Sequence, residues 1–163
     1  MMGNFRLVFP VVVVMIAMFL TACSGDATAP RDLLLSPEDF PRSGVTETSR
    51  ETGETNQNEP AVQVELTSQD FTVLESLVLF ESEDLAMVLL SEIKQDQLAQ
   101  GVDAHPAEGF HANSGVLADQ LHGEDASTLF FVEGRALVRI TLSGVDHANR
   151  VWEVARLARE KSG

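Results

Sequence analysis

The chain has 163 residues, of which 25 are Asp or Glu and only 11 are Lys or Arg, so its formal net charge is −14. This length suits one domain better than two. Because an acidic surface repels phosphate groups, the composition argues against nucleic acid as a partner. Cys23 is the single cysteine, so no disulfide forms within the chain and packing must stabilise it.

The N-terminus has the order of a secretory signal. Arg6 supplies one positive charge, and an apolar run without polar side chains extends from Leu7 to Leu20. Small residues then precede Cys23, as they do before a cleavage site. The run is shorter than the roughly 20 apolar residues that a spanning helix needs. We therefore predict that residues 1–22 are a signal peptide.

The four residues Leu-Thr-Ala-Cys, 20–23, resemble the lipobox of bacterial lipoproteins. The resemblance implies that the sulfur of Cys23 receives a diacylglyceryl group and that the chain is cut directly before it. Lipid would then hold the protein outside the cytoplasm, on the cell membrane or on the outer membrane. The alternatives are a buried or membrane-embedded free thiol, and ordinary cleavage after Ala29.

Residues 23–60 are predicted to be a lipid-anchored flexible tether. Its second half, 42–60, holds a single hydrophobe, Val45, and such a stretch buries too little apolar surface to become ordered. A short apolar segment interrupts it at 33–41. There Ser36 is a suitable N-cap before a proline, which predicts one helical turn. The apolar residues around that turn can dock on the domain; they are Leu33, Leu34, Leu35 and Phe40.

The domain itself is predicted to span 61–163. Apolar and polar residues alternate over 62–66, the pattern of a half-buried strand, and a more continuously apolar strand follows over 71–82. The period then changes to that of a helix. Ser82 is a good N-cap for this helix and Gly101 a good stop.

The second half of the domain begins with a loop rich in Gly and His. A short strand is predicted over 116–121, followed by a hairpin over 127–142 with its turn at Glu133 and Gly134. An amphipathic helix from about 145 to 161 closes the chain, with Trp152 on its apolar stripe.

The order of elements is therefore strand, strand, helix, strand, strand, strand, helix. Short connections require a mostly antiparallel sheet, so we predict an α+β domain with about five strands and two main helices packed on the sheet. Phe130 and Phe131 are adjacent in a strand and must face opposite sides. If the second side is uncovered, its apolar patch is the best candidate binding surface.

Three segments of this domain together resemble a group of known proteins. They are the strand and helix of 78–93, the hairpin of 130–144 and the closing helix of 148–161. Their layout is similar to that of small secreted lipoprotein and sensor-type domains of actinobacteria, some of which have the sandwich of Mog1- and PsbP-like proteins. The resemblance implies a binding or accessory module, and it carries no functional residues over to this chain.

Residues with catalytic or metal-binding chemistry are sparse. His105 and His111 share a loop, and His122 lies beside Glu124 and Asp125, so these histidines are the candidate metal ligands. Their spacing matches no helical or hairpin ligand pair, which favours solvated loop histidines. No Gly-x-Ser-x-Gly motif is present, and no cofactor motif stands out.

The sequence thus favours a lipid-anchored extracytoplasmic binding or accessory module that is not an enzyme. Its expected partners are the membrane, through lipid on Cys23, and an envelope protein or a small ligand; no cofactor is expected. One alternative is a metal-dependent or other hydrolase that uses the loop 105–125. Another is a structural envelope lipoprotein without a ligand.

Overall fold

The computed structural model describes residues 29–41, 43–102, 106 and 108–163. Within them a single antiparallel sheet has the strand order β1-β2-β3-β6-β5-β4. The strands are β1 (Thr46–Glu54), β2 (Pro60–Thr67), β3 (Phe71–Leu79), β4 (Gly115–Leu121), β5 (Glu124–Glu133) and β6 (Ala136–Gly144). The α+β class and the antiparallel sheet are confirmed, with six strands where about five were predicted.

The additional strand, β1, lies inside the stretch that we expected to be a flexible tether. Its sequence is polar, and most of its side chains are exposed. Pairing with β2 nevertheless satisfies one row of its backbone groups, and its position at the edge of the sheet leaves the polar side chains in water. Hydrophobicity could not reveal this strand, because its order comes from the neighbouring strand and not from its own burial.

The segment before β1 also belongs to the domain. It contains two short 3-10 helices, η1 (Pro30–Leu33) and η2 (Pro37–Asp39), the second of which is the turn predicted from Ser36. Four apolar side chains of this segment are buried in the core: Leu34, Leu35, Phe40 and Val45. The ordered domain therefore begins near residue 30, earlier than the boundary expected at 61. Residues 23–28, like the predicted signal peptide, lie outside the described residues.

Two α-helices account for the remaining regular structure of the residues that the structure describes. Helix α1 (Glu83–Ala99) begins after Ser82, whose side chain accepts a hydrogen bond from the backbone N–H of Leu85 at 3.3 Å. Helix α2 (His147–Ser162) buries Val151, Ala155 and Ala158, as its apolar stripe predicts.

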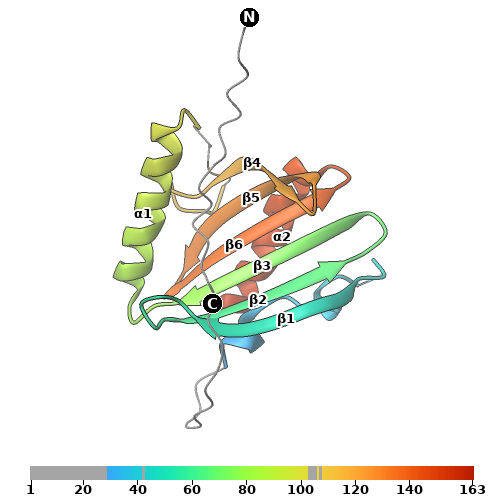
Figure 1. Cartoon of the computed structure of the whole chain (residues 1–163), viewed down its shortest axis with the longest axis horizontal. Coiled ribbons are helices and arrows are strands. Elements are labelled where there is room, and N and C mark those ends of the chain that lie inside the picture. Colours follow the sequence, from blue (N-terminus) through green and yellow to red (C-terminus); the bar gives the residue numbers. More distant parts are fainter. Residues whose placement is uncertain (1–28, 42, 103–105, 107) are drawn as a thin grey trace, which may run out of the picture.

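The helices lie on opposite faces of the sheet, α1 in front and α2 behind in Figure 1. Phe131 belongs to the core on the α2 side, whereas Phe130 packs against the smaller cluster that contains Ala86 and Leu90 of α1. The two rings therefore face opposite sides, as alternation requires. Helix α1 contacts β5 and β6 near one end of the sheet, so neither of the described α-helices covers the middle of this face (Figure 1).

Gly144 at the end of β6 offers a test of the packing between β6 and the turn before β3. Its φ is +105°, and an added Cβ would lie 2.3 Å from the backbone oxygen of Asp70. We expect Gly144→Ala to lower the free energy of unfolding by more than about 2 kcal/mol, because backbone strain and steric overlap add. Denaturant titration measures the change.

Gly101 provides the matched control. Its φ is +79°, yet an added Cβ would meet nothing within 4 Å. Gly101→Ala therefore incurs only the conformational strain, roughly 1 kcal/mol. Equal losses in the two variants would contradict the close approach of Gly144 to Asp70.

Candidate binding face and a buried carboxylate

A polar network crosses three strands on the face that carries α1. The hydroxyl of Thr128 on β5 donates to Oδ2 of Asp119 on β4 at 2.6 Å, and it lies 2.7 Å from the hydroxyl of Thr141 on β6. Arg139 Nη2 donates to the same Asp119 oxygen at 3.1 Å. Both threonines are 1% exposed. Their hydroxyls thus replace the apolar side chains that would otherwise fill the middle of this face.

Arg139 is more exposed to solvent than the two threonines of the network. Its side chain is one-third exposed, and its guanidinium lies 5.8 Å from the centre of the Phe130 ring. The Nε atom is buried and has no hydrogen-bond partner among the described residues. A buried donor without a partner costs free energy, so this N–H group is the least satisfied point of the network.

A second contact links the two halves of the sheet across this face. The turn between β4 and β5 lies three strand spacings from β2, about 14 Å across a flat sheet. Yet Nε2 of His122 in that turn is 2.8 Å from Oε2 of Glu65 on β2. The contact therefore joins the β4–β5 hairpin to β2 across this face, at the end of the sheet away from α1 (Figure 1).

The His122–Glu65 contact also affects the pKa of Glu65. Burial would raise the pKa of this carboxyl, but hydrogen bonds from His122 and from the Thr48 hydroxyl outweigh it, so the pKa lies below its usual value. Glu65 consequently stays ionised at neutral pH and binds the His122 ring of the hairpin through a hydrogen bond.

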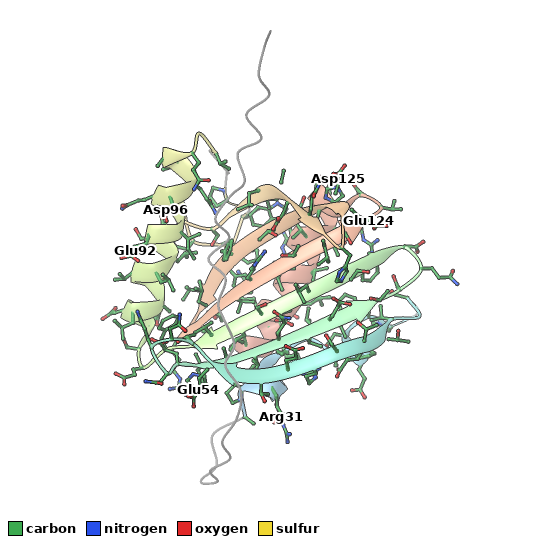
Figure 2. The ribbon with its side chains drawn as sticks, in the orientation of Figure 1. Arg31, Glu54, Glu92, Asp96, Glu124 and Asp125 are labelled. Carbon is green, nitrogen blue, oxygen red and sulfur yellow. The ribbon has the colours of Figure 1, made fainter. Side chains whose placement is uncertain are left out.

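The histidines do not gather into the site that the sequence allowed for. His122 binds Glu65, and His111 Nδ1 accepts from the N–H of Asn113 at 3.1 Å within its own loop. His105 lies outside the described residues. Glu124 and Asp125 are exposed at the start of β5 (Figure 2). In the part of the chain that the structure describes, no three His, Cys, Asp or Glu side chains are placed to hold a metal ion.

On the opposite face lies a residue that sequence analysis did not single out. Glu75, in the middle of β3, is 0% exposed and packs within the core on the α2 side. Its Oε2 accepts a hydrogen bond from the backbone N–H of Leu35 at 2.7 Å, while Oε1 has no partner among the described residues. Alternation could have identified it, because Val73 and Leu77, two residues away on either side, are inward-facing.

The environment of Glu75 favours its neutral form. Burial raises the pKa of this carboxyl to about 7, and the N–H of Leu35 and the charges of Lys161 and Arg50 only partly offset that effect. Asp39 adds a smaller rise. Glu75 therefore titrates near neutral pH, far above an exposed glutamate.

Two further side chains, from α2 and β1, hold the segment above Glu75 in place. Lys161 of α2 donates to Asp39 Oδ2 at 2.5 Å and to the hydroxyl of Ser36 at 3.0 Å. Arg50 of β1 donates to the backbone oxygens of Arg31 at 2.7 Å and Leu35 at 2.9 Å. Burial raises the pKa of Asp39, but bonds from Lys161 and Ser36 outweigh it and lower the pKa overall.

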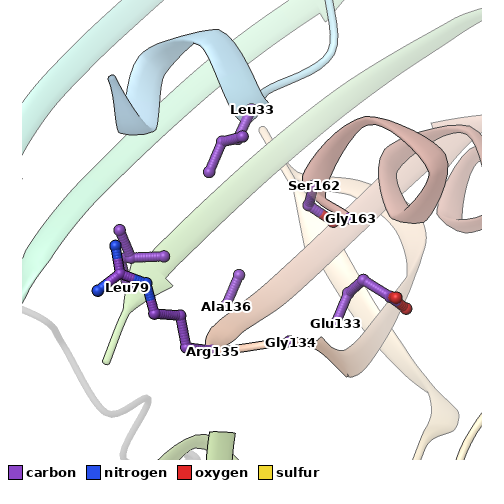
Figure 3. Close-up of a pocket in the computed structure, with 8 residues that line it drawn as sticks. All are labelled: Leu33, Leu79, Glu133, Gly134, Arg135, Ala136, Ser162 and Gly163. Carbon is purple, nitrogen blue, oxygen red and sulfur yellow. The ribbon is translucent and has the colours of Figure 1, made fainter. Parts of the chain in front are cut away.

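Two hollows border this segment. The one in Figure 3, about 350 Å³, lies between Leu33 of η1, the turn from β5 to β6 and the end of α2. Its lining mixes aliphatic side chains with Glu133 and Arg135 and pairs no nucleophile with a base. The other, about 410 Å³, is lined by Arg31, Asp32, Leu34, Ser36, Arg50 and Lys161.

Comparisons with known proteins show a likeness at the level of the fold alone. No protein-family model matches the chain. No curated protein matches it either. The extracellular domain of PknH from Mycobacterium tuberculosis has a similar structure, with a TM-score of 0.60 at 10% sequence identity, over 80% of this chain and 92% of that domain. None of the described helices is both long and apolar enough to cross a bilayer.

The burial of Glu75 predicts how the unfolding free energy of the domain depends on pH. Because its folded-state pKa is above that of the unfolded chain, its contribution to stability is complete below the ordinary value near 4.5 and is lost as pH rises through about 7. The unfolding free energy of the wild type should therefore decline by about 3 kcal/mol between pH 5 and pH 8. In Glu75→Gln this decline should be absent, because the titrating carboxyl group has been replaced. Denaturant titrations across this range measure it.

Glu65→Gln is the matched control, since Glu65 lies on the other face and its pKa is shifted downward. It should leave the decline between pH 5 and pH 8 in place. If the wild type and Glu75→Gln lose stability equally over that range, Glu75 does not titrate as its burial requires.

Proposed function

We propose that this protein is a lipid-anchored module outside the cytoplasmic membrane that acts by binding an envelope protein or a small ligand. The observation that carries the proposal is the fold, which the chain shares with an extracellular domain over 92% of that domain's length. The sequence before the fold supports the same location, because it combines an apolar signal-like run with Leu-Thr-Ala-Cys.

The proposed attachment point is Cys23. Two acyl chains on one residue provide the stable anchoring that a single chain does not. Six residues, 24–29, separate this cysteine from Pro30, the first residue of η1. The proposed anchor and the folded domain are therefore close neighbours along the chain.

The proposed binding surface is the part of this face between α1 and the hairpin of β4 and β5. Its support is the pair of Arg139 and Asp119, whose partly exposed side chains are held in place on the strands by each other and by the buried Thr128 hydroxyl. Fixed polar groups of this kind orient a ligand, whereas a flat apolar face gives little specificity. The His122–Glu65 contact joins the β4–β5 hairpin to β2 at one end of the face.

The anchor is tested by Cys23→Ser in growing bacterial cells. Loss of the thiol should abolish incorporation of labelled fatty acid and shift the protein from the membrane fraction to the soluble fraction or the medium. Immunoblots of the separated fractions and autoradiography of the immunoprecipitated protein measure both effects.

Ser24→Ala is the matched control, because it changes a neighbouring small residue and leaves the thiol in place. This variant should label and sediment like the wild type. Continued membrane retention of Cys23→Ser without label would contradict the proposed anchor.

A further inference from the structure

Residues 30–45 are attached to the domain in a way that differs from every strand. Their backbone-to-backbone hydrogen bonds are local turns such as Asp39 N–H to the Ser36 oxygen and Ser43 N–H to the Phe40 oxygen. Among the described residues, no backbone-to-backbone hydrogen bond joins this segment to the sheet. The segment can therefore leave the sheet without breaking any rung of the strand ladders.

What holds the segment is a set of side-chain contacts from three elements, of which β3 and α2 are far away in sequence and β1 follows the segment directly. Glu75 of β3 accepts from the Leu35 N–H below it, while Lys161 of α2 and Arg50 of β1 bind it from the sides. Four apolar side chains of the segment, named above as part of the core, complete the attachment. Burial of these side chains favours the docked state.

The position of the segment gives its docking a mechanical consequence. While it is docked, residues 24–29 alone join Cys23 to the domain, and six extended residues reach at most about 20 Å. If residues 30–45 detach, 22 residues join Cys23 to β1, with a maximum reach of about 75 Å.

We propose that residues 30–45 are a latch, which holds the domain close to its membrane anchor when docked and lengthens the tether when released. This inference rests on the proposed lipid anchor for its consequence at the membrane. The docking and release themselves depend only on the contacts of the domain.

The buried carboxyl under Leu35 makes the latch sensitive to pH. The groups that face Glu75 are the Leu35 N–H, Lys161 of α2, Arg50 of β1 and Asp39 of η2. Release exposes Glu75 to water and returns its pKa from about 7 toward its ordinary value, so release is coupled to the loss of one proton between those values. The released fraction therefore increases as pH rises toward 7, and it levels off above 7.

The test is the hydrogen exchange of the Leu35 amide in the purified full chain in detergent micelles, corrected for the intrinsic exchange rate at each pH. Since this N–H donates to Glu75, its exchange reports release directly. Protection should fall about tenfold per pH unit from pH 5 to pH 7. It should also be lower than the protection of Val73 and Ile140, because their strands stay paired.

Glu75→Gln removes the titrating group and should make the protection of Leu35 independent of pH over this range. Glu65→Gln, on the opposite face, should retain the wild-type dependence. Leu35 protection equal to that of Val73 at every pH would overturn the latch, because the segment would then open only when the whole domain unfolds. A wild-type profile without pH dependence would overturn the role of Glu75.

The consequence at the membrane is measured on the lipidated chain in liposomes, with a fluorophore on Val145→Cys and an acceptor dye in the bilayer. Val145 is 69% exposed, in the turn before α2. Energy transfer should fall from pH 5 to pH 8 in the wild type and stay constant in Glu75→Gln. Failure of the chain to remain on liposomes overturns the anchor alone, whereas retention with constant wild-type transfer overturns the latch.

Discussion

One helix is too narrow to cover a six-stranded sheet, and the rest of this structure follows from that constraint. Six strands span roughly 25–30 Å, whereas a helix with its side chains is about 10 Å wide. Helix α2 packs over β5 and β6, so the apolar side chains that β2 and β3 direct to the same face need another cover. Residues 30–45 supply it by burying Leu34, Leu35 and Phe40 there.

A hydrogen bond to a buried carboxyl group joins this cover to the sheet. A backbone N–H that points into an apolar core needs an acceptor, and Glu75 provides one from β3 to Leu35. The same burial that makes this bond necessary disfavours the charge on the carboxyl. The attachment of the N-terminal segment is therefore coupled to the protonation of one residue, and that residue lies where a strand would ordinarily carry valine or leucine.

The opposite face meets the same constraint in another way. Helix α1 covers only part of it, and the middle carries hydroxyl, carboxylate and guanidinium groups that bind one another, so they need no apolar cover. Alternation along the strand placed Phe130 and Phe131 on opposite faces, and an apolar patch was the predicted binding surface if the second face was uncovered. The residues that define the face instead come from β4, β5 and β6, where Asp119 precedes Arg139 by twenty positions. No local pattern predicts such pairing, because the register of the sheet creates it.

The sequence by itself determined the elements whose order depends on their own side chains. The alternation in β2 and β6, the capping of α1 by Ser82 and the apolar stripe of α2 all follow from local periodicity, and together they specify an α+β domain. Only the tertiary structure decided that β1 is a strand, that residues 30–45 belong to the core, that Glu75 lies under Leu35, and that His122 meets Glu65. In each of these cases the decisive partner lies on another element of the fold. Local periodicity describes which face a residue prefers, but the three-dimensional packing decides what that face meets.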